Sequence, residues 1–145
     1  MPTKHYRYGG STAGRLLQCP AWLELTDRLP TKPQGSSPDA DRGTLLHDCM
    51  EELLRNPDLE PEALLGRAYK NVTVTEDDVH DAIKPALKAY LEFADDYEIE
   101  IELPEVEVTI DDDIGGTSDI ICANSDTVFV VDWKFGYHPV NAEEN

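Results

Sequence analysis

The apolar residues of this 145-residue chain change their spacing about two thirds of the way along it. Before residue 96 they recur every three or four positions, as on the buried face of a helix. The clearest such run is Leu45, Leu46, Cys49, Met50, Leu53 and Leu54. Over residues 105–110, polar and apolar residues alternate, as in a half-buried strand. The sequence therefore predicts an α/β fold in which N-terminal helices precede a β-meander.

Two further apolar runs, residues 117–123 and 127–133, are the next expected strands. Only the polar stretch Asn124-Ser125-Asp126 separates them, and so short a connection joins antiparallel neighbours. We therefore expect a hairpin in which Asp119 lies approximately opposite residues 131–133. The predicted sheet has fewer strands than is usual for this class of fold.

The N-terminal segment is expected to contain short helices. Ser11 or Thr12 is predicted to cap the first of them, because a hydroxyl at this position can accept from the free N–H groups of the first turn. Cys19-Pro20 interrupts the helix, since proline lacks the N–H that a helix needs. We expect the side chains of Cys19 and Trp22 to lie in the core.

Longer helices are predicted further along the chain. The apolar spacing indicates a helix over residues 41–55, and a short helix is expected around residues 60–68. The stretch Thr75-Glu76-Asp77-Asp78 has the pattern of a capped helix start and opens a longer helix. Pro85 lies inside that helix and is expected to kink it.

The length of the chain suits a single domain with its own core. Within residues 1–145 we distinguish an N-terminal helical and loop segment at 1–40, a helical segment at 41–96 and the sheet with its chemistry at 97–145. No apolar run is long enough to cross a membrane or to act as a signal peptide. The three cysteines are odd in number and widely spaced, which indicates a reducing compartment such as the cytoplasm.

The net charge of −18 argues against non-specific nucleic-acid binding, which depends on Lys and Arg near the phosphates. The charge is uneven, because residues 1–35 contain five Lys and Arg against two acids. Two interpretations stay open. The basic start contacts phosphate, or the protein is simply acidic with a slightly basic N-terminus.

The strand ends carry the residues with the clearest chemistry. Asp132 and Lys134 are two positions apart and share one face of their strand, while Asp119 lies on the neighbouring strand. Two carboxylates and a backbone carbonyl, that of Trp133, are suitable ligands for Mg²⁺ or Mn²⁺. Lys134 is then placed to orient a water or to stabilise a phosphoryl group. The ordinary alternative is a surface ion pair between Asp132 and Lys134.

Four motifs occur in a fixed order along residues 11–136. They are Ser11 with Cys19-Pro20, Gly43-x-x-x-His47, Gly116-x-x-Asp119 and Asp132-x-Lys134-x-Gly136. In this order they resemble the RecB-like branch of the PD-(D/E)XK nuclease superfamily, in particular its phage-borne members. The resemblance implies a restriction-endonuclease-like core and a metal-dependent DNA nuclease, an exonuclease that acts in phage or bacterial DNA processing.

The resemblance also implies roles for particular residues. His47, Asp119 and Asp132 are the implied ligands of Mg²⁺ or Mn²⁺, and Asp119, Asp132 and Lys134 the catalytic residues. An imidazole ligand suits manganese better than magnesium. Glu107 is a further candidate ligand on the preceding strand. Glu105 alternates onto the same face, so the choice between these two glutamates stays open.

RecB-like nucleases usually continue beyond the Asp-x-Lys strand with a helix bearing Gln-x-x-x-Tyr. The sequence ends at Asn145, so the core is expected to be incomplete at its C-terminus. The second hypothesis is therefore a catalytically inactive nuclease-fold module that binds a protein or nucleic-acid partner. An unfinished sheet edge would also favour pairing with another chain or self-association.

Overall fold

A computed structural model describes residue 6 and residues 8–30 and 36–136 of the chain. The chain divides into two compact units, of which one comprises residues 36–106 and 118–145 and contains His47, Asp119, Asp132 and Lys134. The other comprises residues 1–35 and 107–117. None of the described helices is both long and apolar enough to cross a membrane.

Helix α3 (Pro38–Arg55) is the longest element of the first unit and confirms the helix predicted over residues 41–55. It begins three residues earlier than predicted because Ser37 is its N-cap and accepts a hydrogen bond from the Ala40 N–H at 3.2 Å. Pro38 occupies the first turn, where its missing N–H costs nothing. The apolar stripe of the helix is buried from Leu45 to Leu53 as the spacing predicts, and Leu54 is partly buried.

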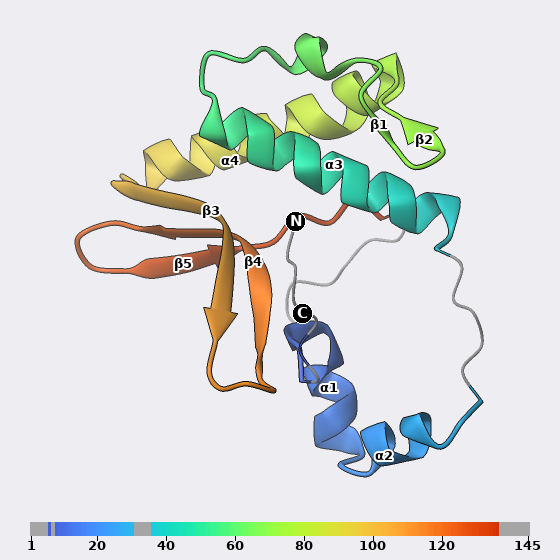
Figure 1. Cartoon of the computed structure of the whole chain (residues 1–145). Helices are drawn as coiled ribbons and strands as arrows, with labels where there is room; N and C mark the ends of the chain where they lie inside the picture. The colour runs from blue at the N-terminus through green and yellow to red at the C-terminus, as the bar shows by residue number, and fades with distance from the viewer. Residues whose placement is uncertain (1–5, 7, 31–35, 137–145) are drawn as a thin grey trace. The chain divides into compact units, whose positions relative to one another are not determined.

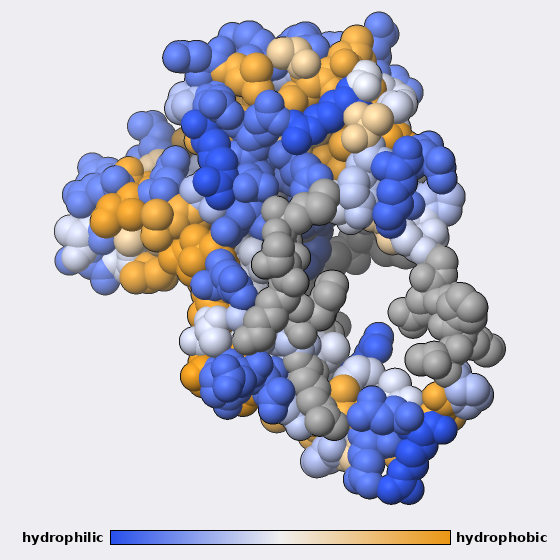
Figure 2. Space-filling model, viewed as in Figure 1, coloured by the Kyte–Doolittle hydropathy of each residue, from blue (hydrophilic) through white to orange (hydrophobic). Residues whose placement is uncertain are grey.

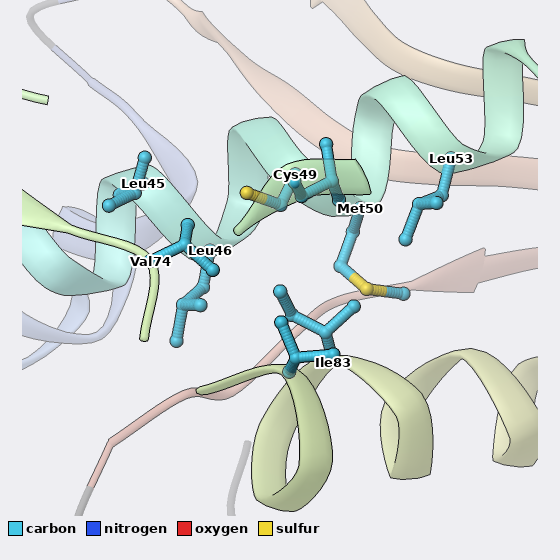
Figure 3. Packing of buried hydrophobic residues seen from close by; sticks show 9 residues of the cluster. Leu45, Leu46, Cys49, Met50, Leu53, Val74 and Ile83 are labelled. Carbon is cyan, nitrogen blue, oxygen red and sulfur yellow. The ribbon is translucent and has the colours of Figure 1, made fainter. Parts of the chain in front are cut away.

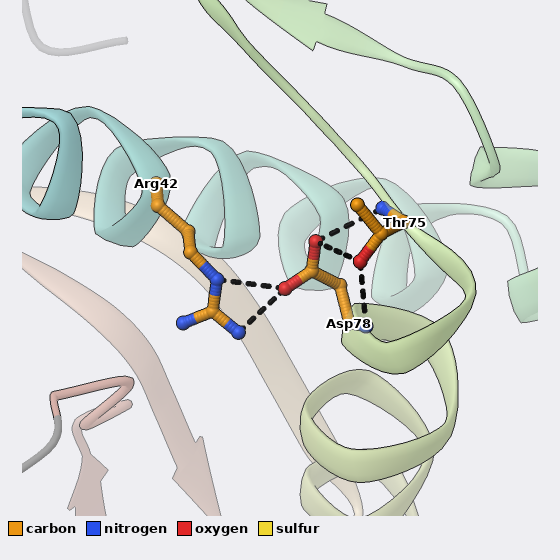
Figure 4. A network of polar contacts seen from close by, with 3 residues as sticks. All are labelled: Arg42, Thr75 and Asp78. Atoms are coloured by element: carbon orange, nitrogen blue, oxygen red, sulfur yellow. Dashed lines mark hydrogen bonds and ion pairs between the residues drawn. The ribbon is translucent and has the colours of Figure 1, made fainter.

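The predicted capped start at Thr75 is present. The Thr75 N–H donates to the Asp78 carboxylate at 2.9 Å, and the Asp78 N–H donates to the Thr75 hydroxyl at 3.1 Å. The buried Asp78 carboxylate also accepts from the Arg42 Nε of helix α3 at 2.7 Å (Figure 4). This network holds the start of the second helical segment against α3.

Pro85 does not merely kink a continuous helix. A π-helical turn, η2 (Asp78–Ile83), comes first, and α4 (Lys84–Asp96) follows with Pro85 in its first turn. A proline cannot donate to the preceding turn and its ring crowds that turn, so the wider π-helical backbone accommodates it.

The short helix expected around residues 60–68 is confined to one 3₁₀ turn, η1 (Pro61–Leu64). It is followed by a small hairpin, β1 (Ala68–Tyr69) and β2 (Val72–Thr73), which was not predicted. Lys70 in its turn has φ of 51°, the left-handed conformation that tight hairpins require. The hairpin lies beside the start of α3 (Figure 1), where Lys70 pairs with Asp41 at 2.6 Å.

The predicted meander is confirmed as a three-stranded sheet of order β3-β4-β5, made of β3 (Ile101–Thr109), β4 (Gly115–Ala123) and β5 (Val128–Val131). Strands β4 and β5 are antiparallel, and Ile120 pairs with Val131. That register places Asp119 opposite Asp132, as expected. The Asn124 side chain closes the turn by accepting from the N–H groups of Asp126 and Thr127.

Two groups of buried side chains hold the helices to each other and to the sheet. In the first, Leu46 and Met50 of α3 face Ile83 of the η2 turn (Figure 3). In the second, Tyr90 of α4 packs with Ile120 and Cys122 of β4. Trp133 contacts both groups and lies edge-on to Tyr90 with the ring centroids 5.8 Å apart. Trp133 therefore packs under helix α4.

The opposite face of the sheet is apolar and exposed. Phe129 and Val131 of β5 pack toward the helices, so the alternating Val128 and Val130 face away from them. These two valines are 69% and 71% exposed, and Figure 2 shows apolar surface over the strands. Such a surface is typical of a contact with another element or chain.

In the second unit, α1 (Gly10–Gln18) and α2 (Trp22–Asp27) correct three predictions. Helix α1 has Gly9 as its N-cap, so neither Ser11 nor Thr12 caps it, and the Thr12 hydroxyl donates to the Gly9 carbonyl instead. Cys19 is exposed rather than in the core. Trp22 is only partly buried, because its ring lies under the Arg15 guanidinium on a helix that buries no residue.

Candidate metal centre

His47 is placed by the buried stripe of α3. It follows the fully buried Leu46 and therefore lies at the margin of the core, where 29% of its side chain is exposed. The Phe135 ring packs edge-on against the imidazole, with centroids 5.4 Å apart and planes at 85°. This contact restricts the orientation of the histidine ring.

Asp119 on β4 is the carboxylate that meets His47. Its Oδ1 lies 3.2 Å from His47 Nδ1, and its Oδ2 accepts the Trp133 backbone N–H at 2.5 Å. The second bond follows from the strand register, since residue 119 lies opposite residue 132. Both oxygens are therefore fixed, and the predicted pair of His47 and Asp119 is in direct contact.

The two candidate glutamates have different surroundings. A ligand atom of Glu105 lies within 4.8 Å of ligand atoms of both His47 and Asp119. Glu107 instead accepts a hydrogen bond from the Tyr6 hydroxyl, and its side chain is exposed. The expected strand alternation fails here because Glu105 has φ of 52°, which is not an extended conformation.

Asp132 and Lys134 form an ion pair with each other at the end of β5. About half of each side chain is exposed, 48% for Asp132 and 47% for Lys134. Both still act on the cluster through their charge, Asp132 on His47 and Lys134 on Asp119. The surface ion pair considered as an alternative is thus present beside the cluster.

Trp133 contacts the cluster through its backbone N–H, which donates a hydrogen bond to the Asp119 carboxylate. The ligand role of its carbonyl stays a prediction. Its side chain faces the core, on the same side of the chain as Phe135, with the two rings stacked at 6.4 Å between centroids.

The surroundings of the cluster raise the pKa values of His47 and Glu105 and lower that of Asp119. Burial favours a neutral imidazole, but the hydrogen bond and negative charge of Asp119 outweigh burial and raise the pKa of His47. Burial acts to raise the pKa of Asp119 as well, whereas His47 and the Trp133 N–H lower it overall. For Glu105, burial and then the charges of Glu51 and Asp119 raise the pKa. The cluster is rich in negative charge and suited to a cation.

The donor atoms also fit a divalent metal. One imidazole nitrogen and carboxylate oxygens suit Mn²⁺, and carboxylates alone with water suit Mg²⁺. The ligand atoms of His47, Glu105 and Asp119 come from three different elements, α3, β3 and β4, and lie within 4.8 Å of one another. The fold therefore assembles a site from residues up to 72 positions apart.

Comparison with protein families matches residues 11–145, nearly the whole chain, to the PD-(D/E)XK nuclease superfamily. The chain belongs to the PD-(D/E)XK nuclease superfamily. Comparisons with curated proteins and with solved structures gave no match. Proteins of this superfamily generally use divalent metals, which agrees with the donor set around His47. The helices followed by an antiparallel sheet also agree with a PD-(D/E)XK nuclease-like core.

The sequence did not assign a role at the site to two residues of this PD-(D/E)XK chain that lie next to the cluster, Glu51 and Phe135. Glu51 lies one helical turn after His47 and acts on Glu105 through its charge; the spacing of four residues on α3 was the available signal. Phe135 contacts His47 and stacks on Trp133. The available signal was its position two residues after Trp133, which puts both side chains on one side of an extended segment.

Proposed function

We propose that this chain is a RecB-like, phage-type member of the superfamily that hydrolyses DNA phosphodiester bonds with Mg²⁺ or Mn²⁺. The observation that carries the proposal is the direct contact of His47 with Asp119, 3.2 Å between Nδ1 and Oδ1, beside Asp132 and Lys134. An exonuclease acting in phage or bacterial DNA processing is the specific activity proposed.

The proposed metal ligands are His47, Asp119, Asp132 and the Trp133 carbonyl. When bound, the ion would lower the pKa of a coordinated water and neutralise charge on the phosphate. His47 must offer a neutral ring nitrogen, and the Phe135 contact supports the orientation of that ring. Asp119 is held by the Trp133 N–H, so little rearrangement is needed before a cation binds.

Lys134 is proposed to act on the attacking water or on a non-bridging phosphate oxygen. In the structure its ammonium pairs with Asp132. Binding of Asp132 to a cation would weaken that ion pair and leave the Lys134 N–H groups available to the substrate. The half-exposed ammonium can be reached by a phosphodiester from solvent.

Digestion of linear single- and double-stranded DNA with Mn²⁺ or Mg²⁺ tests the function. Wild type is expected to degrade DNA, and Asp132→Ala and Lys134→Ala are each expected to lose about a hundredfold or more of the rate. Lys88→Ala, which removes an exposed lysine paired with Glu92 on α4, is the matched control and should keep full activity. Wild-type protein that neither cleaves nor binds either metal would disprove the proposal.

A second candidate function is a catalytically inactive module that binds a protein or nucleic-acid partner or a second copy of itself. The exposed Val128 and Val130 on the edge strand β5 favour it. Light scattering across a range of protein concentrations tests self-association. This alternative predicts a dimer that Val130→Asp abolishes, together with no DNA cleavage in any metal.

A further inference from the structure

We propose that Glu105 is a further carboxylate ligand of the metal and that its unusual backbone conformation places it there. The inference rests on the metal site of the proposed function but adds a residue to it. It also separates Glu105 from Glu107, which the sequence alone could not do.

The first argument is distance. The ligand atoms of His47, Glu105 and Asp119 all lie within 4.8 Å of one another. Mg²⁺ binds oxygen at about 2.1 Å, so ligand atoms on opposite sides of one ion are up to about 4.2 Å apart. Adjacent ligands of such an ion are about 3.0 Å apart. His47 Nδ1 and Asp119 Oδ1 already have about this separation at 3.2 Å, so a movement of the Glu105 side chain on the order of 1 Å brings all three onto a single ion.

The second argument is the environment of the Glu105 carboxylate. The residue is half-buried, and within the described part of the chain its carboxylate has neither a hydrogen bond nor an ion pair. Nearby negative charge comes from Glu51 and Asp119. A carboxylate in such a place is destabilised by burial and repulsion unless a cation joins it.

Glu107, two residues along the same strand, provides the contrast. Its carboxylate is exposed and accepts a hydrogen bond from Tyr6, whose hydroxyl also contacts the Thr109 hydroxyl at 2.6 Å. Its hydrogen-bonding needs are already met in part without a metal. The two glutamates are thus chemically identical but differ in what surrounds them.

The third argument is the backbone. Three described residues other than glycine have positive φ, namely Lys70, Glu98 and Glu105. Lys70 lies in the β1–β2 turn and Glu98 in the turn after α4, where this conformation is common. Glu105 lies inside β3 instead, directly after Pro104. Strained backbone in a regular element is most often found at binding and catalytic sites.

Calorimetric titration with Mn²⁺ tests the inference without relying on nuclease activity. Glu105→Gln is expected to weaken Mn²⁺ binding at least about tenfold, because it removes a negative ligand while keeping the side-chain shape. Glu105→Asp, which keeps the charge on a shorter side chain, should recover part of the affinity. Glu107→Gln is the matched control and should bind as wild type does.

The outcomes separate this inference from the proposed function. Wild-type affinity in Glu105→Gln, alongside lost affinity in Asp119→Asn, would overturn the role of Glu105 and leave the metal site standing. Weakened Mn²⁺ binding in Glu105→Gln without DNA cleavage by wild type would support Glu105 as a ligand while the nuclease proposal fails. Equal weakening of Mn²⁺ binding in Glu105→Gln and Glu107→Gln would also overturn the inference. The weakening would then come from the loss of one negative charge and not from the loss of a ligand.

Discussion

Glu105 and Glu107 show how two identical side chains acquire different properties within one strand. The φ of 52° at Glu105 interrupts the alternation of β3 and brings its carboxylate to His47 and Asp119. A left-handed backbone at a residue with a Cβ is unfavourable by about 1 kcal/mol or more. The site therefore contains a conformation that the fold alone would not prefer.

Replacing Glu105 with glycine should stabilise the fold while weakening metal binding. Glycine adopts positive φ without steric cost, so Glu105→Gly is expected to raise the free energy of unfolding by about 0.5–1 kcal/mol in urea denaturation without metal. Glu107→Gly is the control. It places glycine in a strand position without positive φ and should lower the free energy of unfolding by about 0.5–1 kcal/mol. Destabilisation of both variants alike would contradict the assignment of strain to residue 105.

At the scale of elements, the Arg42–Asp78–Thr75 network joins α3 to the start of the η2–α4 segment (Figure 4). Asp78 is nearly fully buried. The Arg42 guanidinium binds one of its carboxylate oxygens, and the Thr75 N–H and hydroxyl donate to the other. Burial acts to raise the pKa of Asp78, but the hydrogen bonds from Thr75 and Arg42 outweigh it and lower the pKa below its usual value. The carboxylate is therefore more stable as an anion in the folded protein than in the unfolded chain.

Asp78→Asn is expected to destabilise the protein by about 2–4 kcal/mol at neutral pH, because Arg42 loses its charged partner. The contribution of Asp78 is fully present above its unfolded pKa of about 4 and is lost as the pH falls through the lower folded pKa. Urea denaturation at neutral and acidic pH measures both effects. The difference between wild type and Asp78→Asn should shrink below about pH 4. A difference that stays constant with pH would argue against the ion pair.

The major elements were predictable because their patterns are long. The stripe from Leu45 to Leu54 predicted α3, and the alternation with the turn at Asn124 predicted the β4–β5 hairpin and its register. The β1–β2 hairpin could not be found in this way, since strands of two residues have no measurable period. The π-helical turn before Pro85 was missed because its sequence has an ordinary helical pattern.

The candidate site was predictable as far as its residues lie on regular elements. His47 and Asp119 follow from helix and strand positions, and the structure brings them together. The choice between Glu105 and Glu107 depended on a single backbone dihedral angle that strand alternation cannot predict. The contact of Phe135 with His47 depends on tertiary packing between α3 and the chain after β5.

At the scale of the whole molecule, the net charge is −18. The excess acidic side chains repel one another, and they also repel the phosphates of a DNA substrate. Screening should relieve the internal repulsion. Raising NaCl from about 0.05 to about 0.5 M shortens the Debye length severalfold and is expected to raise the thermal unfolding midpoint by a few degrees. A variant with exposed Glu100 and Asp112 replaced by lysine should show a smaller rise. A midpoint that falls with salt would show that attractive charge pairs dominate.

Under the proposed function, a metal on the His47 cluster would supply positive charge where the substrate must approach, which would offset this repulsion. The measurement that tests the central claim most directly is cleavage of linear DNA with Mn²⁺ by wild type and Asp119→Asn. Asn keeps an acceptor for the Trp133 N–H, so the variant should stay folded, as circular dichroism can check. Wild type is expected to degrade the DNA and to stop when the metal is chelated, and Asp119→Asn to lose about a hundredfold or more of the rate. Cleavage by Asp119→Asn at the wild-type rate, or cleavage that continues with chelator, would contradict the account.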